Sequence, residues 1–582
     1  MTNQEIAKIL YEIADFLEMD EVQFKPQAYR KAATALNSLS KDVEEIYKEQ
    51  DEKGIKEIPG VGESIASKII EYIKTGEIEY YQELKEEIPI EIEEITNVEG
   101  IGPKIAQDLY EHLEITNLEE LEEAAKKEKV RELPGFGEKT EQNILEGIEF
   151  LKQSKGRFLL ANIMPAVEKL RTELKDLDEV EKVSVAGSVR RRKETIGDAD
   201  FLVVSDESEQ VMDFFVSRPQ VVKVWGKGET KSSVRLKQDF DVDLRVVPKE
   251  SFGAALQYFT GSKDHNIETR RIAIDKGFKL NEYGLFKDEE KIAGETEEEI
   301  YEALDLEIIP PELREDRGEI EAAQEDNLPN LIDLQDIKGD LHCHTDWDGG
   351  SHSIMEMAEW GIDKGYDYLG ISDHTKFLKI EDGLNEEQLS KQRKEVEEVN
   401  EKLEKQGLDF KVLQGAETNI LKNGSIDIDD EAMEKLDYVI AGVHSHFTVN
   451  EQEMTKRIIK AINHPQVDII SHPTGRILKR RDEYDIDLDK IFEEASENNV
   501  ILEVNSSPQR LDLNAVNIKK AIEADVNLII NTDAHQENQL NYMKYGIYQA
   551  RRGWAEAVNI INTYPLDKFL DSLSNESGNS KS

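Results

Sequence analysis

At 582 residues the chain is too long for one hydrophobic core, so its length predicts three or more domains. Hydrophobic residues make up 38% and charged residues 34% of it, and no segment approaches the roughly 18 to 20 apolar residues of a membrane span, which excludes a membrane-spanning protein. The start lacks a signal-peptide pattern and the single cysteine, Cys343, excludes an internal disulfide, so we expect a cytoplasmic protein without membrane contacts. We also expect a monomer.

The net charge of −51 argues at first against a nucleic-acid partner, because binding the phosphate backbone depends on Lys and Arg. The distribution of charge changes that conclusion. Residues 151–250 carry 19 Lys and Arg against 18 Asp and Glu, so this segment is nearly neutral while the rest of the chain is strongly acidic. We attribute the acidity elsewhere to solvation, and a nucleic-acid partner is not excluded.

Three stretches near the N-terminus repeat a Gly-x-Gly turn followed by an amphipathic helix. They are IPGVGESIASKI at 58–69, VEGIGPKIAQDL at 98–109 and LPGFGEKTEQNI at 133–144, with the glycine pairs Gly60 and Gly62, Gly100 and Gly102, and Gly135 and Gly137. Such a turn directs the free N–H groups of the new helix towards an anion. One copy alone is often only a tight helical hairpin, but three copies resemble helix-hairpin-helix elements, which hold DNA phosphates without reading sequence.

The segment FKPQAYRKAA at 24–33 places Lys25, Tyr29 and Arg30 near one face of a helix, with a solvated basic face as the alternative. Residues 1–85 resemble the small N-terminal domain of family X DNA polymerases, and 86–154 their fingers. The resemblance implies that Lys25 and Tyr29 grip a 5′-phosphate and that Lys68 is the lysine that forms a Schiff base with an abasic sugar. Ser64 stands where relatives have a phosphate-binding lysine. The pKa of Lys68 then has less reason to fall, and we expect at best weak lyase activity.

Two strand patterns in 180–205, joined by a basic loop, place Asp198 and Asp200 on one face of a strand. Paired carboxylates on one face repel each other unless a cation lies between them, which predicts a Mg²⁺ site. The later strand pattern DFDVDLRVV offers Asp239, Asp241 and Asp243, and only a strand next to the first can complete the site. For any single aspartate, a solvated strand end remains the alternative.

The turn before this pair, with Gly187, Ser188, Arg190 and Arg191, suits a triphosphate. Together these features resemble the nucleotidyltransferase fold, which implies two-metal phosphoryl transfer. An enzyme that extends RNA or modifies a small substrate is the alternative within that fold.

The motifs WGKGETK at 225–231 and YFTGSKDHNIETRR at 258–271 closely resemble the palm and thumb of family X DNA polymerases. We expect a palm at 155–250 and a thumb at 251–315. The resemblance implies Asp198, Asp200 and Asp243 as catalytic metal ligands and Lys227 and Lys231 as DNA contacts. It implies nucleotide contacts at Gly187, Ser188, Arg191, Gly197, Tyr258, Phe259, Gly261, Asn266 and Arg270. Asp241 replaces a basic residue of relatives, which alters how the primer terminus is oriented.

An acidic linker is expected at 316–336, followed by a domain at 337–572 and a disordered tail at 573–582. Nine of the eleven histidines lie between 342 and 535, most of them directly after short β-rich runs. Alternating strands and helices whose strands end in potential ligands predict a (β/α)7-type barrel with its site on the C-terminal face. Imidazole with carboxylate suits several Mn²⁺, Fe²⁺ or Zn²⁺ ions close together, for water activation and phosphodiester hydrolysis.

The pattern resembles the polymerase and histidinol phosphatase (PHP) domain. The ligands that this resemblance implies are His342, His344, His374, Glu417, His444, His472, Asp533 and His535. The aspartate expected in relatives falls on Gly349, so Asp348 or His352 is the expected substitute. Cys343 points to the opposite strand face and is left out. For His464 we expect an ordinary core or surface role, and for His446 such a role and a ligand role are both left open.

Overall we expect an α-helical helix-hairpin-helix region, an α/β nucleotidyltransferase palm with a thumb, and a PHP barrel. A family X polymerase followed by a PHP domain implies filling of gaps in gapped or primed DNA with dNTPs. It also implies removal of 3′-terminal nucleotides and cutting at abasic sites, as in DNA repair. The alternatives are a DNA polymerase with a purely structural PHP domain, and a small-molecule phosphoesterase on a DNA-binding scaffold.

Overall fold

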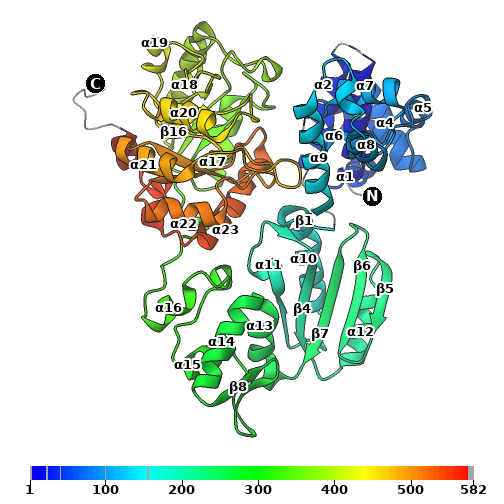
Figure 1. Ribbon diagram of the computed structural model, residues 1–582, viewed down its shortest axis with the longest axis vertical. Helices are drawn as coiled ribbons and strands as arrows, with labels where there is room; N and C mark the ends of the chain where they lie inside the picture. Colours follow the sequence, from blue (N-terminus) through cyan, green and yellow to red (C-terminus); the bar gives the residue numbers. More distant parts are fainter. Residues whose placement is uncertain are drawn as a thin grey trace.

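The computed structural model describes residues 3–20, 22, 24–39, 41–98, 100–153 and 156–573. Figure 1 shows a helical N-terminal region, a central α/β region with a smaller region below it, and a C-terminal barrel. This order of elements confirms the predicted fold class. Apart from Leu573, the expected tail lies outside the described residues. No helix in the described ranges is long and apolar enough to cross a membrane.

The N-terminal region consists of amphipathic helices around one core that runs from Ile6 to Ile148. The two domains predicted at 1–85 and 86–154 therefore share a hydrophobic core. The helices are α1 Asn3–Met19, α2 Lys25–Ser38, α3 Val43–Lys56, α4 Glu63–Thr75, α5 Glu79–Glu87, α6 Ile92–Thr96, α7 Pro103–Leu113, α8 Leu118–Lys126 and α9 Glu138–Gln153.

The central region is a five-stranded sheet in the order β2, β4, β7, β6, β5. Strands β4 and β7 are parallel, and the other neighbours are antiparallel. Its elements are β1 Phe158–Leu159, α10 Leu160–Lys175, β2 Lys182–Val185, α11 Gly187–Arg190, β3 Thr195–Ile196, β4 Asp198–Val204, α12 Ser208–Val216, β5 Val221–Lys227, β6 Lys231–Leu236 and β7 Asp241–Val247.

Side-chain alternation along β4 sets the face on which the aspartates lie. Phe201 and Val203 pack with α10 and α12, whereas Leu202 packs with α13 on the opposite face. Asp198, Asp200 and Leu202 follow one another at intervals of two residues along β4, so their side chains lie on the same face of the sheet, the face covered by α13. The following elements are α13 Phe252–Thr260, α14 Lys263–Asp275, β8 Phe278–Asn281, β9 Gly284–Lys287, β10 Glu290–Ala293 and α15 Glu297–Ala303.

The segment 316–336, predicted as a linker, is partly folded onto the preceding region. It contains helix α16, Glu319–Gln324, whose Ile320 and Ala323 join the core of that region. Glu319 is fully buried and hydrogen-bonds Nδ1 of His265 at 2.8 Å. Ile320 and Ala323 are spaced as on one face of a helix, but two apolar positions among so many acidic residues are too short a pattern to predict a helix.

The C-terminal region is a closed parallel barrel with seven strand positions, as predicted. Bridges between Cys343 and Ala534 and between His374 and Glu417 join the two parallel sheets, and β13 and β14 form one pass of the chain. The strands are β11 Gly339–Cys343, β12 Tyr368–Ile371, β13 Lys411–Gln414, β14 Glu417–Asn419, β15 Ile440–Gly442, β16 Ile469–Ile470, β17 Ile501–Asn505 and β18 Leu528–Asn531. The helices are α17 Ile354–Asp363, α18 Glu386–Lys405, α19 Asp430–Met433, α20 Glu451–Ile462, α21 Leu488–Asn498, α22 Ala515–Glu523, α23 Met543–Arg552 and α24 Leu566–Leu573.

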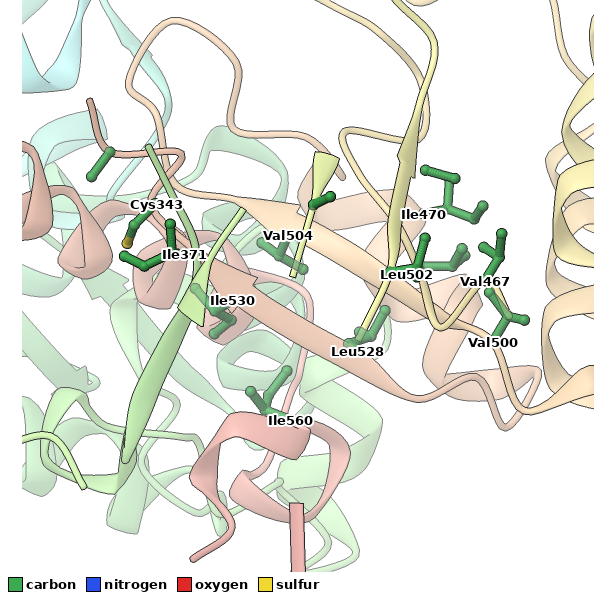
Figure 2. Packing of buried hydrophobic residues seen from close by; sticks show 14 of the residues in the cluster. Cys343, Ile371, Val467, Ile470, Val500, Leu502, Val504, Leu528, Ile530 and Ile560 are labelled. Atoms are coloured by element: carbon green, nitrogen blue, oxygen red, sulfur yellow. The ribbon is translucent and has the colours of Figure 1, made fainter. Parts of the chain in front are cut away.

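Branched apolar side chains fill the layer between the barrel strands and their helices, as Figure 2 shows. Cys343 lies in this layer beside Ile371, and its side chain is fully buried. Burial raises the pKa of the Cys343 thiol well above its usual range. The prediction that Cys343 points away from the ligand face is therefore confirmed.

Candidate functional site

The carboxylates predicted to bind metal lie on two adjacent parallel strands of the central sheet. The register of β4 and β7 places Asp198 opposite Asp241 and Asp200 opposite Asp243, which confirms the expected adjacency. Burial raises the pKa of Asp200 to about 6, and the charges of Asp198 and Asp243 add to that effect. A divalent cation would relieve this repulsion, so the three carboxylates Asp198, Asp200 and Asp243 fit a metal site.

The turn beside these carboxylates requires glycine. Gly187 begins α11 with a φ of 61°, and a Cβ atom added to it would lie 2.5 Å from Oδ2 of Asp200. Any larger residue would collide with the carboxylate and would also be strained. The glycine therefore lets the backbone of the predicted triphosphate turn approach the metal ligands. Gly197, just before Asp198, has open space beside it.

The other predicted nucleotide contacts gather where α13 meets α14. Tyr258 and Phe259 stack edge to face with ring centroids 5.1 Å apart, and Asn266 donates to the Tyr258 carbonyl at 2.7 Å. Arg270 donates to the carbonyl of Asn266 at 3.0 Å. Because Leu256 of α13 packs on the β4 face that carries the aspartates, these residues lie on the same side of the sheet.

Arg191 and Gly261 meet across this junction. Arg191 donates to the Thr260 carbonyl, and a Cβ atom added to Gly261 would lie 3.1 Å from Nη1 of Arg191. Gly261 has a φ of 69°, so glycine is favoured there for both reasons. The structure thus brings Arg191, Gly261 and the Ser188 turn to one side of the carboxylates.

Asp241, which replaces a basic residue of relatives, is neutralised by its neighbours. Arg235 on β6 donates twice to it, each bond 2.8 Å long, and the Trp225 indole donates at 2.7 Å. Arg235 therefore neutralises Asp241 but does not restore the positive charge of a basic residue at this position. Asp239 lies in the preceding turn with a side chain 80% exposed, outside the carboxylate group.

The two lysines predicted to contact DNA are paired with acids in this structure. Lys231 lies 2.7 Å from Oδ2 of Asp243, and Lys227 contacts Asp213. The pairing of Lys231 with a candidate metal ligand places one cation beside the carboxylates.

The N-terminal region contains a cavity of about 500 Å³ lined by Lys25, Tyr29, Ser64, Lys68 and Tyr80, together with the turn glycines Gly60 and Gly62. Nζ of Lys68 lies 4.7 Å from the Tyr80 ring centroid. Burial lowers the pKa of Lys68, although no basic residue stands at position 64. The expectation that Ser64 gives this pKa less reason to fall than a lysine would stays a prediction. Lys68 lies beside the Tyr80 ring, and burial disfavours its charged form.

Arg30 does not join this cavity. It pairs with Asp15 and Glu18 of α1, at 2.6 Å in each case. The helix α2 therefore directs Arg30 towards α1 and directs Lys25 and Tyr29 towards the cavity, which corrects the predicted grouping of these three residues on one binding face.

All three Gly-x-Gly repeats form the predicted turns. The first glycines, Gly60, Gly100 and Gly135, have φ values of 76°, 83° and 86°. The second glycines open the helices: Gly62 and Gly102 are the N-caps of α4 and α7, and Gly137 precedes α9. The N–H groups at the start of each helix are suited to phosphate oxygens.

The predicted ligands of the barrel converge at the C-terminal ends of its strands. Three overlapping groups each hold three potential ligand atoms within 4.8 Å of one another. They are His344, His374 and His535; His342, His344 and Asp533; and His374, Glu417 and His444. His472 completes the set, because its Nε2 lies 3.0 Å from Oε1 of Glu417.

Unpartnered ring nitrogens indicate that this set fits cations. Nε2 of His342 and of His344, and Nδ1 of His374, are buried and form no hydrogen bond of good geometry, although carboxylate oxygens lie close to them. Nδ1 of His374 lies 2.9 Å from Oε2 of Glu417, and Nε2 of His342 lies 3.3 Å from the same oxygen. Buried polar atoms without partners are destabilising, and divalent cations between these nitrogens and carboxylate oxygens would satisfy them. The overlap of the groups suits more than one ion.

A second layer of side chains fixes the imidazole rings. Glu503 on β17 binds Nδ1 of His342 at 2.7 Å, and Asn419 on β14 binds Nδ1 of His444 at 2.9 Å. Such partners set the tautomer and orientation of metal-binding histidines. The sequence reasoning missed Glu503, although a carboxylate inside the apolar run ILEVN was a usable signal.

Asp348 belongs to this second layer. Its Oδ2 accepts from Nδ1 of His344 at 2.7 Å and from the backbone N–H of His374 at 2.8 Å, and its Oδ1 accepts from the Gly350 N–H at 3.0 Å. Asp348 also lies within 4.8 Å of Asp373, but hydrogen bonds occupy the oxygens of both. These hydrogen bonds give Asp348 an orienting position, while its group with His344 and Asp373 could also hold a metal ion, so its role as a direct metal ligand stays a prediction.

The alternative substitute, His352, packs edge-on against the Trp360 ring, with centroids 4.4 Å apart, and is not in the ligand groups. The space beside Gly349 is occupied by another acid, Glu381, which is not in the ligand groups either. A Cβ atom added to Gly349 would lie 2.3 Å from Oε2 of Glu381. His464 lies near Asp430 at the surface, and His446 is exposed in a loop, so neither joins the site.

Comparisons with known proteins match several regions of the chain. Family models described as a helix-hairpin-helix domain, a SAM-like helix-hairpin-helix tandem, a DNA polymerase beta thumb and a PHP domain match residues 1–78, 92–149, 255–315 and 340–507. DNA polymerase lambda from Rattus norvegicus is 25% identical over 301 residues, which are 49% of each chain. A probable phosphatase from Caldanaerobacter subterraneus is 31% identical over 207 residues, which are 34% of this chain and 75% of the relative.

One relative matches nearly end to end. It is the DNA polymerase/3′-5′ exonuclease PolX from Bacillus subtilis, 38% identical over 580 residues, which are 97% of this chain and 98% of the relative. The expected order of polymerase elements and PHP domain is thereby confirmed. The chain belongs to the PolX family, in which a family X DNA polymerase carries a C-terminal PHP domain.

Proposed function

We propose that this chain is a repair polymerase that fills short gaps in DNA by templated addition of dNTPs and removes 3′-terminal nucleotides at a second site. The observation that carries the polymerase assignment is the register that brings Asp200 opposite Asp243, beside the Gly187 turn. The full-length similarity to a DNA polymerase/3′-5′ exonuclease supports both activities. Cutting at abasic sites is a further activity that we assign to the second site.

In the polymerase site Asp198, Asp200 and Asp243 would hold two Mg²⁺ ions. Bound there, these ions activate the primer 3′-hydroxyl and neutralise charge on the triphosphate during in-line displacement. The N–H groups of the Gly187–Ser188 turn and the Arg191 guanidinium hold the triphosphate. Their donors match phosphate oxygens, and the glycine allows the backbone to approach closely.

The remaining polymerase residues select and align the nucleotide. Tyr258 and Phe259 present an aromatic wall to the sugar, and Asn266 is positioned by two hydrogen bonds, from Gln257 and to the Tyr258 carbonyl. Arg270 follows on the same helix and contacts the template. Positioning of this kind is the main contribution a protein makes to phosphoryl transfer.

In the barrel, His342, His344, His374, Glu417, His444, His472, Asp533 and His535 would hold two or three divalent cations, with Mn²⁺, Zn²⁺ or Fe²⁺ suited to the mixed imidazole and carboxylate set. Such ions, when bound, lower the pKa of the attacking water and stabilise charge on the phosphate. Asp533 and His535 line a cavity of about 750 Å³ that is also lined by Pro508, Asn538 and Tyr542. A 3′-terminal nucleotide would enter through this cavity.

Glu381 would act as the metal ligand in place of the aspartate that is missing at position 349. Its Oε2 lies where a side chain at 349 would begin. Asp348, the neighbouring acid, is already occupied by His344, His374 and Gly350. The carboxylate of Glu381, in the loop after β12, thus replaces the carboxylate that relatives have at position 349, in the loop after β11.

The polymerase assignment is tested by replacing single aspartates of the segment DFDVDLRVV, which contains both Asp239 and Asp243. Asp243→Asn should abolish nucleotide addition on a gapped duplex, whereas Asp239→Asn, in the exposed turn, should leave it near the wild-type rate. Both variants should keep 3′-exonuclease activity, because that site is in another domain. Normal gap filling by Asp243→Asn would contradict the assignment.

A further inference from the structure

The loop that joins α11 to β3 contains Arg191, the residue we assign to the triphosphate, and it is held by the PHP domain. Arg552, at the end of α23, donates from Nη1 to the carbonyl of Arg191 at 2.7 Å and to Oε1 of Glu315 at 3.1 Å. The Arg552 side chain is only 5% exposed. A PHP-domain arginine is therefore buried against the polymerase loop.

Glu315 connects Arg552 to the Arg191 side chain. Its Oε1 also accepts from Nε of Arg191 at 3.0 Å, and its Oε2 lies 3.6 Å from Nζ of Lys193. Burial acts to raise the pKa of Glu315, but the charges of Arg552, Lys193 and Arg191 hold this pKa at about 2. One PHP residue thus fixes both the backbone of Arg191 and the carboxylate that orients its guanidinium.

A second set of PHP side chains holds the end of the same loop. Arg476 donates to both carboxylate oxygens of Glu194, at 2.8 and 3.2 Å, and Gln549 donates to it at 3.1 Å. The Arg192 guanidinium lies over the Tyr548 ring, 4.5 Å from its centroid. The loop is therefore held on the PHP domain along its length, from Arg191 to Glu194.

We propose that the PHP domain is part of the nucleotide-binding apparatus of the polymerase, with Arg552 as the positioning residue that holds Arg191 ready for the triphosphate. The proposal rests on the assigned role of Arg191. Without Arg552, the loop loses an anchor and Glu315 loses one of the cations that fix it. The PHP domain would then support nucleotide addition independently of its own metal site.

The test is steady-state gap filling by the full chain with varied dNTP concentration. Arg552→Gln should raise KM for dNTP roughly ten-fold, the size expected for one charge-assisted hydrogen bond, with a smaller change in kcat. Arg552→Lys should restore part of the affinity. The matched control is Arg551→Gln, because Arg551 also bonds across the domains, to Glu312 and to the Ile332 carbonyl, but does not touch the loop.

A double-mutant cycle separates the proposal from general loosening of the interface. In an Arg191→Ala background, Arg552→Gln should change KM little further, because both act through one guanidinium. An unchanged KM in Arg191→Ala would overturn the assigned role of Arg191. A raised KM in Arg191→Ala with a normal KM in Arg552→Gln would overturn only the positioning role. Equal effects of Arg551→Gln and Arg552→Gln would also overturn that role.

Discussion

Replacing Glu297 by glutamine tests the buried ion pairs that join palm and thumb. Glu297 accepts from Arg190 at 2.5 and 2.9 Å and from Arg314 at 2.5 Å, and its side chain is 6% exposed. Although burial acts to raise it, the charges of Arg314 and Arg190 lower the pKa of Glu297 from 4.5 to about 2. That difference corresponds to about 3 kcal/mol in favour of the folded protein with the charged carboxylate.

We therefore expect Glu297→Gln to lower the free energy of unfolding by about 3 kcal/mol at pH 7, because the buried Arg314 and the partly buried Arg190 then lack their carboxylate. Since the folded-state pKa is depressed, this contribution is fully present above about pH 4.5 and is lost as the pH falls towards 2. Denaturant unfolding of wild type and variant measures the difference, and Glu298→Gln, at an exposed neighbour, is the control. A loss below about 1 kcal/mol, or a difference that does not shrink below pH 4.5, would refute the reasoning.

Two further predictions concern the metal and lyase sites. Glu381→Gln should lower the number or the affinity of the Mn²⁺ ions bound per chain, as measured by equilibrium dialysis, whereas the control Asp382→Asn should not. Equal metal binding by the wild type and Glu381→Gln would contradict the proposal that Glu381 replaces the missing aspartate at position 349. Borohydride trapping of a 5′ abasic end should be weak in the wild type and absent in Lys68→Ala. Trapping should be stronger in Ser64→Lys, which restores a cation for the 5′-phosphate. Efficient trapping by the wild type would show that Ser64 does not weaken the lyase activity.

Strand periodicity and spacing predicted the parts of the site that lie on regular elements. Asp198 and Asp200 are two apart on a strand, so their common face follows from the sequence, and the strand of Asp243 could be placed by the same pattern. The glycine turns of the N-terminal region also follow from local sequence, because positive φ favours glycine. The barrel was predictable because most of its strands end in a predicted ligand.

Contacts between distant segments could not be predicted in this way. The position of Glu381 beside Gly349 depends on how two loops fold against each other, and no spacing records it. Arg30 and Lys25 share a helix, but the packing of α2 on α1 separates their directions. The lowered pKa of Lys68 likewise depends on burial beside Tyr80, a residue twelve positions away on another helix.

The central claim is that two separate metal centres carry two activities, and it is tested most directly on one gapped duplex with a labelled primer. The variant His342→Ala with His344→Ala should lose 3′-exonuclease activity by ~10²-fold or more, because it removes ligands from overlapping metal groups. Its gap filling should remain near wild type, since Asp198, Asp200 and Asp243 are in another domain. Near-normal exonuclease activity in the folded double variant would contradict the account and leave the PHP domain a structural module.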